Sequence, residues 1–387
     1  MKRTVTVKEL KFCLTGSCFL GSGGGGNITL ASDWLNNKEI ITESDKITLQ
    51  DVEDCDPDLL TAVVFFMGAP ECYKKEYQIK PVVQAFVQLQ KKVLATTGKK
   101  IGYLIPGEIG AMNMLVPFLV ANQLNKQNNG QTIAVINGDG SGRAVPELQM
   151  TTFAAQQVSA SPAVVSNSDG FYIAVEIGNL PSTANSAQVV ESILRPVLAL
   201  PEFNEVGGLA LWLMNRSDLQ KSAIRNTVAC AIAMGSYLQN TAFETINQSG
   251  IKSIYQMINP ALAVKVIDNL IFDSINESTA GGFDQGAIVL KTAGDPDLRI
   301  TAIIQNETLL VWLNTSTSPL VKAPESCALL FNNSWKALSN GDIDSMQKDL
   351  KNCRVKMVIL QAVPQISEGV ILNAYQAVLQ KFGYYGS

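Results

Sequence analysis

The amino-acid sequence predicts an α/β fold: a three-layer α/β sandwich with a mostly parallel sheet, plus a smaller, barrel-like C-terminal domain rich in β-strands. Three segments between residues 61 and 157 each combine a buried strand, a glycine-bearing loop and a helix, and this alternation is typical of a parallel sheet. Beyond Pro260, short alternating segments suit a β-rich unit. We therefore expect an N-terminal domain over 1–165 and a C-terminal domain over 166–387, packed closely because no low-complexity linker separates them.

The chain begins with a helix that leads into a run of glycines. Thr6 and Glu9 have the spacing of a capping box, and Asn27 is placed to cap a second helix. The run consists of Gly23, Gly24, Gly25 and Gly26. With Gly21 they match the dinucleotide pattern GxGxxG, but that pattern requires a preceding strand, and the helix here argues against it. The loop can still present N–H groups to an anion or a carbonyl oxygen.

Three strand, loop and helix units follow. The first has a strand that ends at Gly68 and a helix over 80–95. The second has a strand over Ile101–Ile105 and a helix from about Asn113, and the third spans 132–157. Ligands bind beyond the carboxyl ends of parallel strands, and those ends carry the segments GAP, GEIGAMN and NGDGSGRA.

The C-terminal domain is predicted to begin with a hairpin over 162–178, followed by helices between about 185 and 257 and then by the barrel-like part. In that part the segment IIQNETLLVWL is predicted as one strand. Gln305, Asn306 and Glu307 interrupt its apolar pattern. These three residues either reach over a site from the second domain or mark a bulge.

The composition excludes several classes of function. The chain has no histidine, which removes Ser-His-Asp and Cys-His nucleophile systems, imidazole metal sites and the usual neutral-pH proton switch. Its net charge is −4 and its basic residues are scattered, so we expect no nucleic-acid partner. No apolar run approaches the ~18 residues of a membrane helix, so we expect no membrane partner either.

Cysteines and surface charge bear on location and assembly. Seven cysteines form no CxxC pair and follow no signal peptide, which predicts reduced thiols and a cytoplasmic location. Cys72 is the best candidate for a reactive or metal-bound thiolate. Charged residues make up only 17% of the chain, which is compatible with a homo-oligomer or larger assembly and equally with an ordinary soluble protein that has a polar, uncharged coat.

Polar residues after the third predicted strand are the first candidate site. Asp139 lies between glycines, Arg143 lies near the following helix start, and Glu147 lies in its first turn. Asp139 has two possible roles. It acts in the site as an acid, a base or a ligand-orienting group, or its side chain makes a hydrogen bond that stabilises the turn. Arg143 can hold an anion or a carbonyl group. Glu147 either belongs to the site or favours the helix dipole.

A second candidate group follows the strand over Ile101–Ile105. Glu108 and Asn113 converge with Asp139 if the two strands are neighbours; otherwise Glu108 is a loop carboxylate that faces water. Asn306 joins this group if its segment reaches over the site. A small-molecule ligand is the partner that such a cluster predicts.

Several of these segments occur in the order seen in a known family. LGSGGGGN, MGAP, GEIGAMN, NGDGSGRAVPELQMTTF, QNE and FGYYGS resemble the S-methyl thiohydantoin desulfurase domain family, which is associated with hydantoinase and oxoprolinase systems. The resemblance implies an N-terminal α/β sandwich, a β-rich C-terminal domain, and a site between them for a five-membered, hydantoin-like ring. It also implies a zinc ion as a cofactor, although the chain offers no histidine ligand.

The resemblance carries over to individual residues. The implied site residues are Gly23 to Gly26, Glu108, Asn113, Asp139, Arg143 and Glu147. The chain departs from the family pattern at Asn137, where Asp is usual, and at Ser141, where Met is usual. The first change removes a carboxylate beside Asp139.

Two hypotheses of function follow. In the first, the protein is a hydrolase or desulfurase that attacks a C=S or C=N carbon of a hydantoin-like ring with water. Asp139 or Glu108 activates the water, Arg143 and the glycine-loop amides bind the heteroatom charge, and Asn113 orients the ring. In the second, the fold persists without catalysis and the protein is a binding or self-assembling structural component. A nucleotide-dependent oxidoreductase is a distant third.

Overall fold

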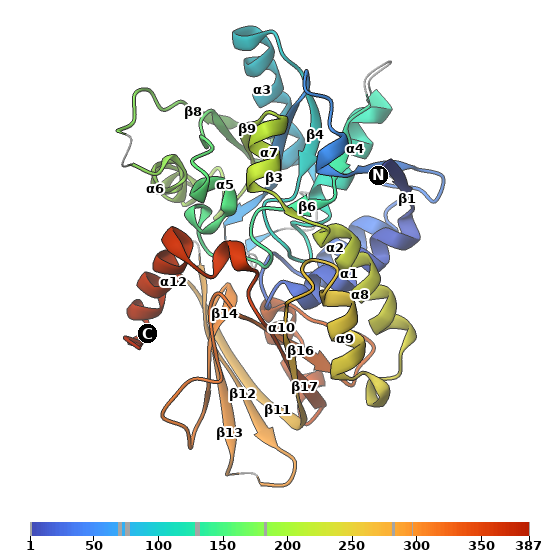
Figure 1. The fold of residues 1–387 in the computed structure, drawn as a ribbon, viewed down its shortest axis with the longest axis vertical. Coiled ribbons are helices and arrows are strands. Elements are labelled where there is room, and N and C mark those ends of the chain that lie inside the picture. Colours follow the sequence, from blue (N-terminus) through green and yellow to red (C-terminus); the bar gives the residue numbers. More distant parts are fainter. Residues whose placement is uncertain are drawn as a thin grey trace.

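A computed structural model describes residues 2–68, 72–73, 78–127, 132–181, 184–280, 283–295 and 297–386. The predicted fold class is confirmed: one half is an eight-stranded sheet with helices on both faces, and the other is a seven-stranded antiparallel sheet curled into a half-barrel. Figure 1 shows the first sheet in the upper half and the half-barrel below it, with helices of both chain halves between them. Among the described residues, no helix has the length and apolar character needed to cross a bilayer.

The first sheet is parallel in its middle and antiparallel at both sides. Its strands, in spatial order, are β1 (Lys2–Val5), β2 (Ile47–Gln50), β5 (Ala134–Ile136), β4 (Ile101–Ile105), β3 (Leu60–Gly68), β9 (Val206–Met214), β7 (Ala163–Ser166) and β8 (Tyr172–Val175). Only β2, β5, β4 and β3 run parallel to one another. The sheet is thus mixed rather than mostly parallel, because β7 and β8 form a hairpin that cannot make a parallel crossover.

Strand β9 is not predicted by the sequence analysis, and it lies beside β3 near the centre of the sheet. The first sheet therefore extends past residue 165, the predicted end of the N-terminal domain. Strand β9 is apolar along most of its length, and such a run does not reveal by periodicity whether it forms a strand or a buried helix.

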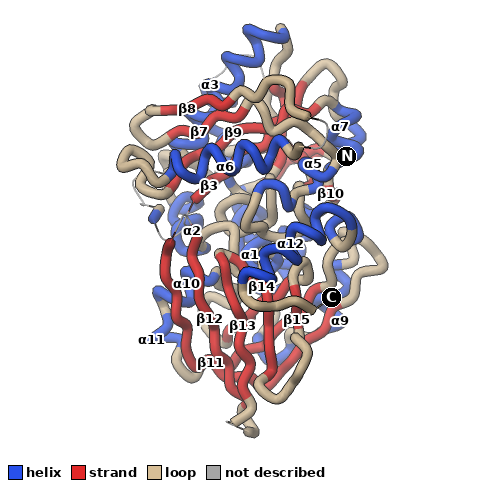
Figure 2. The backbone as a smooth tube through the Cα atoms, turned by 90° about the vertical axis from the view of Figure 1, so that its left-hand side faces the viewer, coloured by secondary structure: helices blue, strands red, loops and turns tan. Residues whose placement is uncertain are grey.

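The side chains of β3 alternate between two cores and so produce the three layers. Ala62 and Val64 pack into one core with helices α3 (Lys80–Thr97) and α4 (Val116–Gln127). Val63 and Phe65 pack into the other core with α6 (Ser186–Leu198) and α7 (Arg216–Ser222). Figure 2, turned by 90°, shows α6 running across the strands of this sheet. A strand buried on both faces needs this continuous apolar sequence.

The half-barrel is built from the last third of the chain. Its strands, in spatial order, are β15 (Val321–Lys322), β14 (Glu307–Leu313), β13 (Arg299–Gln305), β12 (Phe283–Thr292), β11 (Val264–Ala280), β17 (Arg354–Leu360) and β16 (Ser326–Phe331). The segment predicted as one strand over 303–313 is instead a tight hairpin. Its tip is Asn306, with φ of 58°, and Gln305 pairs with Glu307 across the turn. An Asn in this left-handed conformation reverses the chain, which a strand pattern alone does not signal.

Helices α1 (Val7–Leu20) and α8 (Thr227–Asn240) join the two halves. The predicted capping box of Thr6 and Glu9 is present. A Cβ on Gly235 would lie 1.7 Å from the Phe12 carbonyl oxygen, so glycine at this position permits the close crossing of the two helices.

The remaining elements are shorter. They are β6 (Gly138–Asp139) paired with β10 (Ile224–Arg225), α2 (Ile28–Asn36), α5 (Thr152–Ala155), α9 (Gln248–Tyr255), α10 (Asn340–Ser345), α11 (Gln347–Leu350) and α12 (Gly369–Lys381), with 3-10 turns η1 (Val52–Asp54), η4 (Leu148–Met150), η5 (Phe243–Thr245) and η6 (Pro364–Ile366). The helix predicted in the third unit is reduced to η4 and α5. The predicted Asn27 side-chain cap of α2 is absent. Asp342 of α10 instead accepts the Ile28 N–H at 2.8 Å.

The glycine loop lies at the junction of these parts. A Cβ on Gly23 would lie 2.2 Å from Asn340 Oδ1, and one on Gly24 would lie 2.2 Å from Glu307 Oε1. A Cβ on Gly25 would lie 2.4 Å from the Gly110 Cα. The four glycines thus leave room for the half-barrel on one side and for the loop after β4 on the other.

Substituting two glycines that share a backbone conformation tests this role. Gly25 has φ of 73° and Gly98 has φ of 68°, but only Gly98 has open space around its missing Cβ. We expect Gly98→Ala to lower the free energy of unfolding by about 1 kcal/mol through backbone strain, and Gly25→Ala by about 3 kcal/mol or more because backbone must also move. Urea denaturation measures both, and equal losses would contradict the packing role.

Candidate functional site

A pocket opens where the carboxyl ends of β3 and β4 meet the glycine loop and the β13–β14 hairpin. Segments from both halves of the chain line it. Aromatic side chains form much of the wall, including Phe65, Phe66, Tyr73 and Trp212. A largely apolar hollow with a few polar groups is the usual form of a small-molecule site.

Glu108 is held at the centre of the pocket by two donors. Its Oε1 accepts a hydrogen bond from Asn113 Nδ2 at 2.6 Å, and its Oε2 accepts one from the Val145 N–H at 2.8 Å. Asn113 is in turn fixed by the backbone of Phe66, whose N–H it accepts at 2.9 Å. Glu108 and Asn113 therefore converge on each other and on the end of β3, whereas Asp139, with which they were predicted to converge, does not line this pocket.

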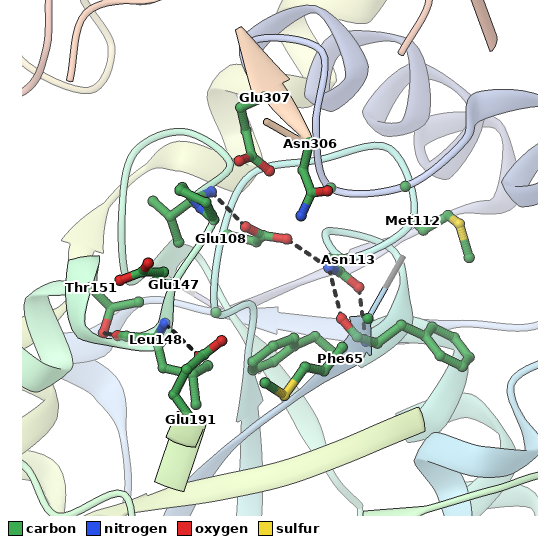
Figure 3. Close-up of a pocket in the computed structure, with 18 of the residues that line it drawn as sticks. Phe65, Glu108, Met112, Asn113, Glu147, Leu148, Thr151, Glu191, Asn306 and Glu307 are labelled. Carbon is green, nitrogen blue, oxygen red and sulfur yellow. Dashed lines mark hydrogen bonds between the residues drawn. The ribbon is translucent and has the colours of Figure 1, made fainter. Parts of the chain in front are cut away.

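Glu307 reaches the same pocket from the half-barrel. Asn306 exchanges two hydrogen bonds with Asp284: its N–H donates to the Asp284 carbonyl at 2.7 Å, and its Oδ1 accepts the Asp284 N–H at 2.8 Å. This fixes the hairpin tip, and Asn306 and Glu307 both line the pocket. The hairpin thus brings polar side chains of the half-barrel to the pocket, and its ladder also has a register shift between Ile303 and Ile304. Figure 3 shows the Asn306 and Glu307 side chains pointing toward Glu108.

The two carboxyl groups perturb each other. Burial raises the pKa of Glu108 to about 7, although its two donors oppose the rise. Burial and the neighbouring Glu108 raise the pKa of Glu307 well above its ordinary value. Glu307 Oε2 is buried and has no hydrogen-bond partner among the described residues. Burial and mutual repulsion favour a state in which one of the two carboxyl groups keeps its proton, and the two donors to Glu108 favour Glu108 as the group that ionises first.

Asp139 and Arg143, predicted as catalytic, do not line this pocket. Asp139 is fully buried, and its Oδ2 accepts the N–H groups of Ser141 and Gly142, both at 2.8 Å. Burial raises its pKa to about 6. These bonds organise the loop after β6, which corresponds to the turn-stabilising alternative.

Arg143 is also fully buried, and backbone carbonyl groups of the second half surround it. Its Nη1 donates to the Glu325 carbonyl at 2.7 Å, and its Nη2 donates to the Thr308 carbonyl at 3.0 Å. Its guanidinium lies 5.5 Å from the centre of the Tyr375 ring. The side chain joins the two halves rather than facing the pocket. Sequence reasoning could not separate these uses, since both require an arginine beside polar groups.

The other predicted binding residues divide into two groups. Gly25 and Gly26 line the pocket, as does Glu147, which bonds with Gln149 and lies 3.5 Å from Lys381 Nζ. Gly23 and Gly24 do not line it. The Gly25 carbonyl accepts the Met112 and Asn113 N–H groups, at 2.9 and 3.2 Å. The glycine loop therefore accepts hydrogen bonds from the loop after β4, and it also forms part of the pocket wall.

Sequence reasoning did not single out Glu191 and Arg195 of α6, which line the pocket at its outer side. Their Oε1 and Nε atoms are 2.5 Å apart. One signal was available: Glu191 lies on the buried stripe of α6 between Val190 and Leu194, where an apolar residue is expected. The aromatic wall had no comparable signal, because buried aromatic residues are typical of any core.

The donor set does not fit zinc, which was implied by the family resemblance. Within the described ranges, no three Cys, Asp or Glu side chains gather closely enough to hold a metal ion, and the chain has no histidine. Burial raises the pKa of Cys13, Cys230 and Cys327 to about 12, so these groups remain thiols. Cys72 does not line the pocket, and Ala69, Pro70 and Glu71 of the predicted first strand end lie outside the described residues.

Comparison with known proteins identifies relatives over most of the chain. Residues 8–176 match a family described as "S-Me-THD-like, N-terminal domain", and residues 184–367 match "S-Me-THD-like, C-terminal domain". The fold is similar to a crystal structure of a protein from Chromobacterium violaceum, with a TM-score of 0.83 and 28% identity over 99% of this chain and 98% of that one. The description of that structure states no activity. No curated protein matches the chain significantly.

The buried carboxyl pair predicts how stability depends on pH. A raised pKa in the folded state contributes stability below the unfolded value of 4.5, and this stability is lost as the pH rises through the folded value. For Glu108, a rise from 4.5 to about 7 corresponds to roughly 3 kcal/mol.

We therefore expect the free energy of unfolding to fall between pH 5 and pH 8. The isosteric Glu307→Gln should reduce this fall, since it removes one ionisable group and the repulsion at the other. Urea denaturation at the two pH values measures the effect. An unchanged pH dependence in Glu307→Gln would contradict the buried, charge-coupled pair.

Proposed function

The chain belongs to the S-Me-THD-like family, and on that premise we propose that it is a hydrolase that replaces sulfur by oxygen on a hydantoin-like ring. The observation that supports this most is the facing of Glu108 and Glu307 in a hollow lined by aromatic side chains. Glu108 has two donors that stabilise its charge, whereas Glu307 Oε2 is buried without a hydrogen-bond partner among the described residues. Two carboxyl groups with pKa values driven apart by their environments can serve as a base and an acid.

The reaction can be written for a ring carbon that bears a methylthio group and a double bond to nitrogen. The Glu108 carboxylate takes a proton from water as the water oxygen bonds to that carbon, and Glu307 gives its proton to the ring nitrogen. The Glu307 carboxylate then takes the hydroxyl proton as the carbon–sulfur bond breaks. Sulfur leaves with the bonding electrons and takes the proton held by Glu108. The products are a ring carbonyl and a thiol, and both carboxyl groups regain their starting states.

The lining of the pocket suits a flat, weakly polar ring as the substrate. Phe65 and Phe66 supply apolar faces, and the paired Glu108 and Glu307 supply one acceptor and one donor. Asn306 Nδ2 points toward Glu108 in Figure 3, where it can orient a ring oxygen. In this proposal Glu307 takes the acid role, and no part of the reaction requires Asp139 or Arg143.

Asn137, which departs from the family pattern and supported the non-catalytic alternative, does not line the pocket. Asn137 Nδ2 donates to Asp51 Oδ1 at 3.0 Å, and its Oδ1 accepts the Ala229 N–H at 3.0 Å near the start of α8. Its amide therefore serves as donor and acceptor in a structural junction. The pocket keeps its own carboxyl pair, which favours the enzyme over a degraded relative.

Assembly and location remain proposals from composition. We propose a homo-oligomer, because charged residues make up only 17% of the chain, and a cytoplasmic location, because seven cysteines without a CxxC pair suit reduced thiols. Light scattering of the purified protein measures its size. Extended filaments would favour the self-assembling alternative.

Substitution of either carboxyl group tests the reaction. We expect Glu108→Gln and Glu307→Gln each to lower kcat/KM for an S-methyl thiohydantoin by about 10²-fold or more, since each removes one proton-transfer group. The released thiol is measured with a thiol reagent. Glu244→Gln, an isosteric change at an exposed carboxyl group that pairs with Arg354, is the control and should retain wild-type turnover. Wild-type turnover in all three variants would refute the assignment.

The pH profile gives an independent test. Activity should rise as Glu108 ionises near pH 7 and fall at higher pH as Glu307 loses its proton, so kcat/KM should be bell-shaped. In Glu307→Gln the residual activity should lose the alkaline fall and keep the rise near pH 7. A profile that is flat from pH 5 to 9 would exclude this pair as the acid and base.

A further inference from the structure

The Glu191–Arg195 pair separates the pocket from a second, outer groove. Both side chains line both hollows, and the groove is otherwise formed largely by α6 and α12. Glu191 is 7% exposed although it is charged. A buried ion pair is weak support for stability, since desolvation offsets much of the attraction.

On one side the pair fixes the chain segment that contacts Glu108. Glu191 Oε2 accepts the Leu148 N–H at 2.9 Å, and Arg195 Nη2 donates to the Pro146 carbonyl at 3.0 Å. The preceding residue, Val145, donates its N–H to Glu108. Two hydrogen bonds from α6 thus fix the segment 146–148, which follows the Val145 N–H that donates to Glu108.

On the other side the pair contacts the half-barrel. The Arg195 guanidinium lies 4.1 Å from the centre of the Phe283 ring, at the start of β12. The next residue, Asp284, makes the two backbone hydrogen bonds that fix Asn306. Glu307 follows Asn306 directly. The Arg195 guanidinium is therefore linked indirectly to both acids. Its bond to Pro146 leads to Glu108, and its contact with Phe283 leads to Glu307.

We propose that Glu191 and Arg195 are positioning residues that set the relation between Glu108 and Glu307 across the two halves of the protein. The inference rests on the proposed function for its purpose, but the geometry can be tested without turnover. A purely stabilising pair would alter the free energy of unfolding and leave the titration of the two carboxyl groups unchanged.

The direction in which the pKa of Glu108 shifts when Glu191 is substituted distinguishes a positioning role from a direct effect of the Glu191 charge. Glu108 faces Asn113 and the Val145 N–H, with Asp139, Arg143 and Glu307 as the charged groups that act on it. If Glu191 acted through its own charge, its removal would lower the pKa of Glu108. If Glu191 acts by positioning Val145, its removal weakens a hydrogen bond to the ionised form, and the pKa of Glu108 rises.

The test uses Glu191→Gln, which keeps the shape of the side chain and places an amide donor beside Arg195. Carboxyl ¹³C chemical shifts of ¹³C-glutamate-labelled protein are followed from pH 4 to 10, with Glu108→Gln and Glu307→Gln used to assign the two signals. We expect the Glu108 midpoint to rise by about one pH unit, which corresponds to the loss of one hydrogen bond. An unchanged or lowered midpoint in the folded variant would overturn the proposal.

A matched control exists elsewhere on the chain. Arg354 pairs with Glu244 and lies 5.6 Å from the centre of the Phe243 ring, so it also combines an ion pair with an aromatic contact, away from the pocket. Because the charge of Arg195 itself lowers the pKa of Glu307, the variants keep that charge: Arg354→Lys should leave both midpoints unchanged, whereas Arg195→Lys, which loses the planar fork, should raise the Glu108 midpoint as Glu191→Gln does. Because the two act as a unit, the double variant should show no larger shift than either single variant.

Phe283→Leu keeps the ion pair and removes only the ring, and it provides the test if Glu191→Gln fails to fold. We expect the Glu307 midpoint to fall toward its ordinary range, because a relaxed hairpin lies farther from Glu108. Wild-type titration in Phe283→Leu would overturn the link to the half-barrel. These measurements need no substrate, so they can fail while turnover is present, and they can succeed while the proposed reaction fails.

Discussion

One buried guanidinium, that of Arg143, lies at the junction of the two halves of this protein and bonds across it. Arg143 leaves a loop of the first half and gives its hydrogen bonds to carbonyl groups of the second, at Thr308, Pro324 and Glu325. A buried cation is tolerated when its donors are fully used, and five N–H groups in a planar fork can meet several carbonyl groups at once. Through the Thr308 carbonyl, this contact links the loop after β6 to β14, the strand that carries Glu307 to the pocket.

The same cation affects the acids of the pocket. It lowers the pKa values of Glu108 and Glu307 against the larger effect of burial, which raises them. Without a nearby positive charge, the cost of ionising even one buried carboxyl group would be greater. Arg143 thus contributes to the chemistry through the field and the geometry that it imposes, and it needs no contact with a ligand.

Ordering four consecutive glycines on folding costs more conformational entropy than ordering other residues would. The close contacts that only glycine permits offset this cost. Gly24 lies against Glu307, and Gly25 lies against Gly110. The space left by the missing side chains lets two loops and a hairpin meet within one hollow. The sequence suggested a cradle of N–H groups, whereas the structure uses the absence of Cβ atoms and the carbonyl of Gly25.

The sequence by itself determined the class of the fold, the strands β3 and β4, the glycine loop, the half-barrel and the presence of Glu108 and Asn113 at a strand end. Those features follow from local patterns: apolar runs, capping spacing and loop composition. The tertiary structure alone decided that Asp139 and Arg143 do not line the pocket, that β9 lies beside β3 in the sheet, and that Glu307 and Glu191 line the pocket. The reason is physical: the role of a buried charge depends on which groups surround it, and those groups come from segments far apart in the chain.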